Sequence, residues 1–94
     1  MTVEPTIDAV LNGLVEELAA VEHERWAHWQ RYMHSKGVRQ NDGALTIPAE
    51  LVERWDRQAA TSYDALGDRE RESDREQVAR YLPIIAAALK KAQL

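Results

Sequence analysis

Apolar side chains recur along the first third of the chain at the spacing of one face of an α-helix. They are Ile7, Val10, Leu11, Leu14, Val15 and Leu18. The helix begins near Pro5, where Thr2 or Thr6 caps it, because proline fits the first turn. Gly13 weakens the helix without ending it. Lys36, with a glycine beyond it, is a favourable C-terminal end, so one long helix is predicted.

The middle of the chain is its least helical part. Asn41-Asp42-Gly43 is strong turn chemistry, so residues 38–47 form either a tiny β-hairpin or an ordered loop. Pro48 then opens a short second helix that fades over residues 58–61. The apolar face of this helix consists of Leu51, Val52 and Trp55.

The last third of the chain predicts a kinked helix. Its apolar stripe consists of Val78, Leu82, Ile85 and Leu89. Pro83 lies inside this stripe and removes a backbone hydrogen bond, so it kinks the helix or splits it. Ser73 and Glu76 match a capping box, which places the helix start at Ser73, and the charged run 68–76 is a solvated face. The predicted fold class is all-α, or nearly so.

Length and composition limit the classes of protein to which this chain can belong. The 94 residues form a single helical domain, residues 1–94, with one modest core. The net charge of −4 argues against nucleic acid, which rewards a clustered positive face. There is no cysteine, so disulfides and thiolate metal sites are excluded. No apolar run reaches the ~20 residues of a membrane span and the N-terminus does not read as a signal peptide, so the default location is cytoplasmic.

Residues 22–33 hold the side chains with the most chemistry. His23 and His28 are candidate zinc ligands by residue type. At ~100° per residue, however, their five-residue spacing places them roughly 140° apart around a helix. A metalloprotease helix needs its histidines four residues apart on one face. No metal site and no cofactor are therefore predicted.

Glu22 has two interpretations. Beside the apolar wall of Trp26 its pKa is raised and it serves as a general acid or base. Alternatively it forms a structural ion pair, for instance with an arginine of the last helix. The ion pair is favoured, because no second catalytic group, phosphate loop or nucleophile motif accompanies it.

The tryptophans of this helix divide in the same way. Tryptophans at helical spacing are more often core than ligand site, so Trp29 and Met33 are expected to face the core. Trp26 lies among His23 and Arg25, and it is the one placed to stack on a planar ligand.

Two motifs extend this interpretation. The first is Leu18-Ala19-Ala20 followed by His23-Glu24-Arg25-Trp26, and the second is Tyr63-Asp64-Ala65-Leu66 followed by a charged run that includes Asp74-Arg75. Together they resemble the RyR domain, the module repeated in ryanodine receptors, which also occurs as a stand-alone bacterial or phage protein. The resemblance covers residues 18–89.

The resemblance implies a mostly helical, non-enzymatic module that binds a nucleotide-type ligand. The implied ligand-binding residues are His23, Trp26, Tyr63 and Arg75, with Glu22 and Asp74 in support. In this scheme Trp26 stacks on the ligand, His23 hydrogen-bonds beside it, and Arg75 meets a phosphate. The family's Gly-Trp-x-Tyr-Gly segment is replaced here by residues 37–41, so its aromatic pair is missing.

The predicted function is a small binding module that senses or sequesters a nucleotide-type ligand. The alternative is a homo-oligomeric protein–protein interaction module without a small ligand, because a short chain with a long aromatic helix can bury that face against its own copy. An acid–base enzyme centred on Glu22 ranks below both, and no catalytic residue is assigned.

Overall fold

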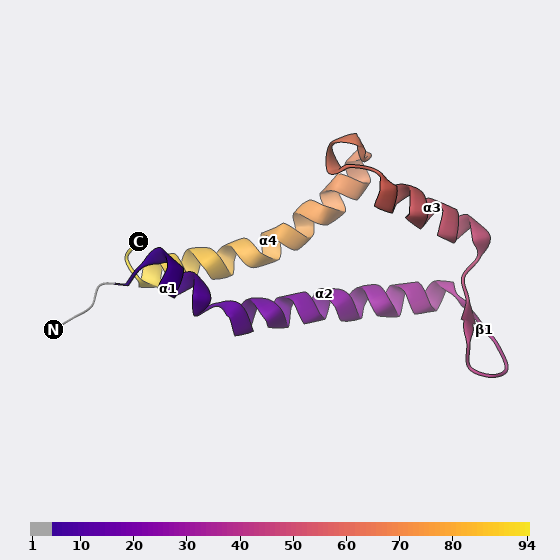
Figure 1. Ribbon diagram of the computed structural model, residues 1–94, viewed down its shortest axis with the longest axis horizontal. Helices are drawn as coiled ribbons and strands as arrows, with labels where there is room; N and C mark the ends of the chain where they lie inside the picture. The colour runs from indigo at the N-terminus through magenta and orange to yellow at the C-terminus, as the bar shows by residue number, and fades with distance from the viewer. Residues whose placement is uncertain (1–4) are drawn as a thin grey trace. The chain divides into compact units, whose positions relative to one another are not determined.

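A computed structural model describes residues 5–94, and Figure 1 shows its elements in chain order. The elements are α1 (Ile7–Asn12), α2 (Val15–Lys36), β1 (Val38–Arg39), β2 (Leu45–Thr46), α3 (Ala49–Ala60), the 3₁₀ turn η1 (Tyr63–Ala65) and α4 (Asp68–Lys91). The predicted fold class, nearly all-α, is confirmed. Contacts divide the chain into two compact units, one of Met1–Arg25 with Asp74–Leu94 and one of Trp26–Ser73.

The first unit opens with a short helix rather than with the start of a long one. Thr6 caps α1, where its Oγ1 accepts the N–H of Ala9 at 3.1 Å; Thr2, the alternative cap, lies outside the described residues. The chain breaks at Gly13, so the uninterrupted helix predicted from Pro5 to Lys36 is wrong at that point. A Cβ at Gly13 would lie 3.3 Å from the carbonyl oxygen of Val10, a tight fit that glycine avoids.

The break at Gly13 directs the side chain of Leu14 toward the interior of the first unit. Leu14 donates its N–H to the carbonyl of Leu11 at 3.0 Å, which tightens the end of α1, and α2 then starts at Val15. Leu14 is 7% exposed, and it is the only buried side chain among residues 5–94. The small core of the first unit therefore centres on this leucine.

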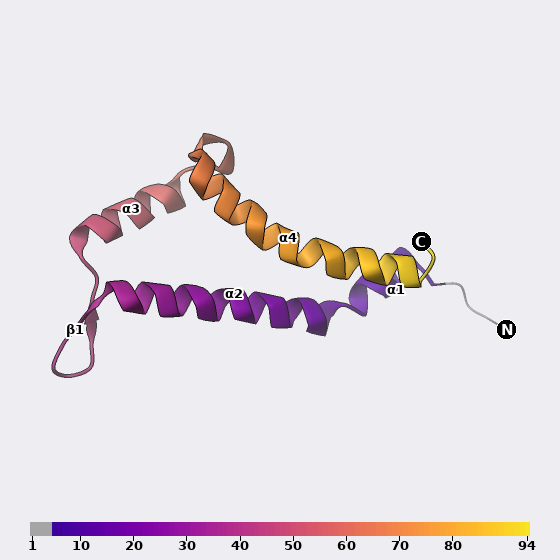
Figure 2. The same ribbon diagram turned by 180° about the vertical axis from the view of Figure 1, so that it is seen from behind.

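In the first unit the N-terminal half of α2 and the C-terminal half of α4 run antiparallel and side by side (Figures 1 and 2). Side-chain hydrogen bonds join them, from Tyr81 to Glu22 and from Arg80 to Glu24. The half-buried side chains on their facing sides are Leu18, Val21, Gln77, Tyr81, Ile84 and Ala88. Two helices alone cover one stripe of each other, so these side chains stay partly exposed.

Helix α4 differs from its prediction at its N-terminus. It begins at Asp68 instead of Ser73, with Asp68 and Glu70 in the first turn, where carboxylates suit the positive end of the helix dipole. Arg71 pairs with Asp68 at 2.6 Å and reinforces that turn. Pro83 does not split the helix, which runs without interruption to Lys91.

The second unit is organised by a hairpin and an aromatic contact. Strands β1 and β2 pair antiparallel, with Val38 opposite Thr46, so the hairpin alternative for residues 38–47 is confirmed. The ring of Trp29 meets that of Trp55 in α3 edge-on, with centroids 5.2 Å apart. Trp29 is still 40% exposed, so the expectation that it faces a core is wrong. It packs on one neighbouring helix and is not enclosed.

The turn of the hairpin requires a glycine. Gly43 has φ +90°, a backbone conformation that side chains with a Cβ rarely adopt. The N–H of Gly43 bonds to the carbonyl of Gln40 at 3.0 Å, and the N–H of Ala44 bonds to Asp42 Oδ1 at 2.9 Å. The short side chain of Asp42 thus holds the turn that joins β1 to β2.

Replacement of two glycines tests this conformational requirement. A Cβ added at Gly43 or at Gly67 would meet nothing within 4 Å, and of the two only Gly43 has a positive φ. Gly43→Ala is expected to lower the free energy of unfolding by about 1–2 kcal/mol, whereas Gly67→Ala changes it by no more than about 0.5 kcal/mol. Urea unfolding followed by circular dichroism measures both, and equal losses would contradict the assigned turn.

Candidate functional site

The residues that the sequence placed in a ligand site belong to both units. His23 and Arg75 lie in the first unit, on α2 and α4, together with the supporting Asp74. Trp26 and Tyr63 lie in the second unit, on α2 and η1, and their side chains are 54% and 46% exposed. Each unit therefore holds two of the four predicted ligand-binding residues.

Trp26 lines an open hollow on the surface of the second unit. The hollow has a volume of about 490 Å³, within the ~300–1,000 Å³ range of small-molecule sites. It is lined by Trp26, Ala27, Gln30, Arg31, His34, Ser35 and Arg39, and we call it the Trp26 hollow. Tyr63 is not among the residues that line it. Of the predicted ligand residues in this unit, the hollow therefore includes one, the proposed stacking side chain.

Helix α2 and strand β1 build the Trp26 hollow together. Trp26, Gln30 and His34 are spaced four residues apart, so they line up along one face of α2. Arg39 comes from β1, directly beyond the end of that helix. Its Nη1 donates to the carbonyl oxygen of Gly43 at 3.1 Å. The hairpin turn thus fixes the position of Arg39 beside the helix.

The charge of the Trp26 hollow is opposite to that of the whole chain. The protein carries a net charge of −4. The described residues that line the hollow include two arginines and a histidine, and none is acidic. A guanidinium group offers up to five N–H donors in a planar fork suited to phosphate or carboxylate. An exposed indole beside such groups favours a ligand with one flat face and one anionic end.

Sequence reasoning missed Arg31, His34 and Arg39 as members of this site. One signal was present in the sequence, because His34 follows Trp26 by two steps of four residues on the same helical face. Arg31 follows Ala27 on the adjacent line of the same helix in the same way. No sequence pattern indicates Arg39, because its place depends on the register of the hairpin.

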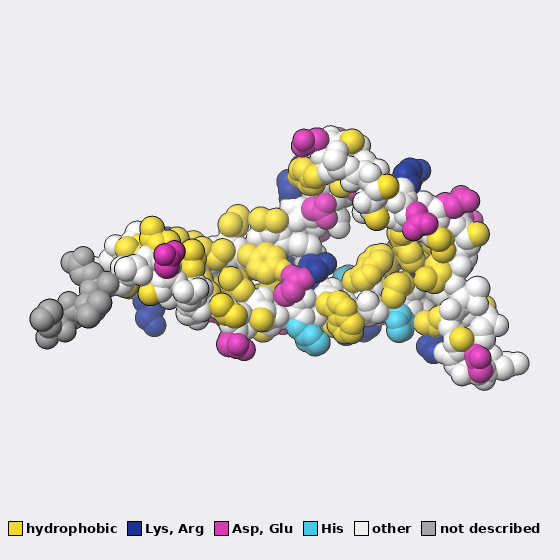
Figure 3. All heavy atoms as spheres, in the orientation of Figure 1, with side chains coloured by type: hydrophobic (Ala, Val, Ile, Leu, Met, Phe, Trp, Pro, Cys, Tyr) yellow, Lys and Arg dark blue, Asp and Glu magenta, His cyan; other side chains and the backbone are white. Residues whose placement is uncertain are grey.

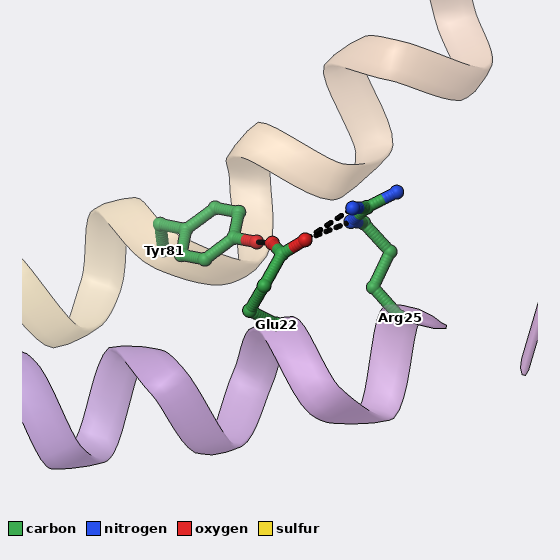
Figure 4. Close-up of polar contacts among 3 residues, drawn as sticks. All are labelled: Glu22, Arg25 and Tyr81. Atoms are coloured by element: carbon green, nitrogen blue, oxygen red, sulfur yellow. Dashed lines mark hydrogen bonds and ion pairs between the residues drawn. The ribbon is translucent and has the colours of Figure 1, made fainter. Parts of the chain in front are cut away.

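In the first unit Glu22, Arg25 and Tyr81 form a second polar group, the Glu22 cluster. Figure 4 shows the carboxylate of Glu22 between the guanidinium of Arg25, on the same helix, and the hydroxyl of Tyr81, on α4. Arg25 Nε donates to Glu22 Oε1 at 2.9 Å, and Tyr81 donates to Oε2. The predicted structural ion pair of Glu22 is present. Its arginine belongs to the same helix, and the last helix supplies a phenol instead.

The Glu22 cluster stabilises the ionised carboxylate. The hydrogen bond from Arg25, followed by the one from Tyr81, lowers the pKa of Glu22 from 4.5 to about 2. The same contact with Glu22 raises the pKa of Tyr81 above its usual value of 10.0. General acid–base work near neutral pH requires a raised carboxyl pKa, so the interpretation of Glu22 as a general acid or base is wrong.

The described residues form neither a metal-binding cluster nor a membrane-spanning helix. Among residues 5–94, no group of three or more histidine or acidic side chains is arranged to hold a metal ion. Within the same residues, no helix combines the length and apolarity needed to cross a membrane. No protein-family model, no curated protein and no solved structure matches this chain. The resemblance to the RyR domain therefore stays a prediction.

The lowered pKa of Glu22 predicts a loss of stability in acid. Its value is about 2 in the folded protein, against 4.5 for an ordinary glutamate. The cluster therefore stabilises the fold fully above pH ~4.5, and this stabilisation disappears as the pH falls from there toward ~2. Urea unfolding between about pH 6 and pH 2.5 is expected to show a smaller loss of stability in Glu22→Gln than in the wild-type protein. Glu53→Gln, at an exposed position of α3, serves as the matched control and should behave as wild type.

The contribution of the phenol is separately measurable. In Tyr81→Phe the carboxylate loses one of its two donors, so the pKa of Glu22 is expected to rise toward its ordinary value while remaining below it. Carboxyl carbon NMR during a pH titration reads this pKa directly. Tyr63→Phe removes a phenol from the second unit and should leave the titration of Glu22 unchanged. An unshifted Glu22 in Tyr81→Phe would contradict the assigned contact.

Proposed function

We propose that this chain is a non-enzymatic binding module for a small nucleotide-type ligand, bound at the Trp26 hollow. The observation that carries the proposal is the half-exposed indole of Trp26 in a hollow that also presents Arg31 and Arg39. A nucleotide combines a flat base with an anionic phosphate, which are the two features that this set of side chains complements. The RyR-like motif around Trp26 adds independent support for its stacking role.

The expected ligand contacts divide between the two kinds of side chain. The base stacks on the indole of Trp26, a contact that contributes about 1–3 kcal/mol per base in single-stranded nucleic-acid sites. Arg31 and Arg39 donate to phosphate oxygens, and His34 adds an N–H donor from the same helix. The RyR resemblance implies ligand roles for His23, Tyr63 and Arg75 as well, although none of the three lines the Trp26 hollow.

Calorimetric titration with a small panel of ligands tests this function. The panel contains a nucleoside, inorganic phosphate, nucleoside mono- and diphosphates, and cyclic nucleotides. At least one nucleotide is expected to bind more tightly than the nucleoside or the phosphate alone, because only a nucleotide uses both the indole and the guanidinium groups. Absence of binding by every nucleotide would overturn the proposal.

Point variants then assign the contacts. Trp26→Ala is expected to weaken nucleotide binding about ten-fold or more, and Trp26→Phe should retain most of the affinity because it keeps a stacking face. Arg31→Ala and Arg39→Ala should weaken nucleotide binding, while nucleoside binding changes little. Arg54→Ala, on the exposed surface of α3, is the matched control for a lost positive charge.

A further inference from the structure

The first unit has a hollow of its own between α1, the start of α2 and the C-terminal part of α4. Its volume is about 410 Å³, within the ~300–1,000 Å³ range of small-molecule sites. Figure 3 shows apolar side chains gathered over this end of the unit. The lining of the hollow is apolar except for Glu17 of α2 and Lys91 of α4, and we call it the Leu14 hollow.

All three helices contribute apolar groups to the Leu14 hollow. Leu14 is the buried side chain of the unit, at 7% exposed, and Val10 and Ile84, which also line the hollow, are half-buried. Ala87 and Ala88 of α4 carry a single methyl group each, so they leave space that larger side chains would fill. An apolar recess between helices with a small number of polar groups is typical of a small-molecule site.

The two charged residues of the Leu14 hollow lie along one edge of the helix pair. Glu17 precedes Glu24 by about two turns of α2, and Lys91 follows Arg80 by about three turns of α4. The edge that carries the Glu24–Arg80 ion pair therefore also carries Glu17 and Lys91. At 1.5 Å per residue these steps are about 10.5 and 16.5 Å long, so the second pair of charges is offset along the helices by about 6 Å relative to the first.

Glu17 and Lys91 are not joined to each other. Within residues 5–94, no ion pair or hydrogen bond connects their side chains. Both side chains are exposed and both line the hollow, so its rim presents one carboxylate and one ammonium group. The rim as a whole is neutral, in contrast to the cationic lining of the Trp26 hollow.

We propose that the Leu14 hollow binds an α-amino acid with a large apolar side chain, such as leucine. The ammonium group of the ligand pairs with Glu17 and its carboxylate pairs with Lys91. Both groups are attached to the carbon that also carries the side chain, which then packs on Leu14 and its apolar neighbours. A fatty acid would bring a second carboxylate toward Glu17, and an alkyl amine would bring a second ammonium group toward Lys91. A zwitterion is the head group that complements both.

The amino-acid site is independent of the proposed nucleotide site. The residues that line the Leu14 hollow all belong to the first unit, and those that line the Trp26 hollow all belong to the second. Because its two ion pairs are exposed to water, each strengthens binding only slightly. We therefore expect a dissociation constant on the order of 1 mM for leucine.

Titration of the full chain, followed by the NMR signals of its backbone amides, tests the ligand. The probes are leucine, isocaproate, which lacks the ammonium group, isoamylamine, which lacks the carboxylate, and glycine, which lacks the side chain. Leucine is expected to shift the amide signals of Leu14, Glu17 and Ala88 and to bind at least about three-fold more tightly than any other probe. Absence of shifts with leucine would overturn the proposal. Equally tight binding of isocaproate or isoamylamine would also overturn it, because the hollow would then recognise only an apolar group.

A matched pair of charge variants tests the rim. Glu17→Gln is expected to weaken leucine binding about three-fold, while isocaproate binding does not weaken, because its carboxylate no longer faces that of Glu17. Glu16→Gln removes the same charge from the adjacent exposed position, which does not line the hollow, and should leave both dissociation constants close to those of the wild type. Equal losses of leucine affinity in the two variants would refute the assigned role of Glu17.

A second matched pair tests the apolar recess. Ala87→Leu places a large side chain in the Leu14 hollow and is expected to abolish the shifts that leucine causes. Ala86→Leu adds the same side chain at a neighbouring exposed position of α4 that does not line the hollow, and it should bind leucine as the wild type does. Circular dichroism verifies that both variants keep the helix content of the wild type. Unchanged leucine binding by Ala87→Leu would place the ligand elsewhere and overturn the proposal.

Discussion

Two antiparallel helices in contact can shield only one stripe of each from water. In the first unit a third element, α1, lies beside the C-terminal part of α4, where Ala9 and Val10 line the Leu14 hollow together with Ile84 and Ala88. Leu14, which follows α1, is the one buried side chain among residues 5–94. Further along, the pair is joined by polar contacts from Glu22 and Glu24 to α4. Such exposed contacts contribute little individually, so the limited burial between α2 and α4 is the constraint on which the unit's other features depend.

The position of the Glu22 cluster follows from the same constraint. A carboxylate at the edge of a two-helix contact keeps access to water and also reaches donors on both helices. Arg25 and Tyr81 supply those donors, and together they hold the pKa of Glu22 at about 2. The arrangement favours a permanently ionised structural residue. An apolar enclosure would have the opposite effect, because it raises the pKa of a glutamate toward the range needed for acid–base chemistry.

In the second unit a turn, rather than a core, positions the candidate site. The positive φ of Gly43 lets the chain reverse within the hairpin. The carbonyl of that glycine then accepts the guanidinium of Arg39, which lines the Trp26 hollow from β1. A backbone requirement of one residue is thereby linked to the cationic character of a hollow that is lined mainly by α2. The two arginines of this hollow give a local positive charge to a chain whose net charge is −4.

The sequence alone determined the features that depend on neighbouring residues. Apolar spacing, the glycine after Lys36, the proline before α3 and the Asn41–Gly43 turn predicted the helices and the hairpin, because propensity, capping and turn chemistry act within a few residues. The tertiary structure decided the break at Gly13, the exposure of Trp29, the phenol beside Glu22 and the meeting of Arg39 with Trp26. Apart from the break, which involves the local backbone at Gly13, each of these depends on which residues of another element lie nearby, and no local pattern specifies that.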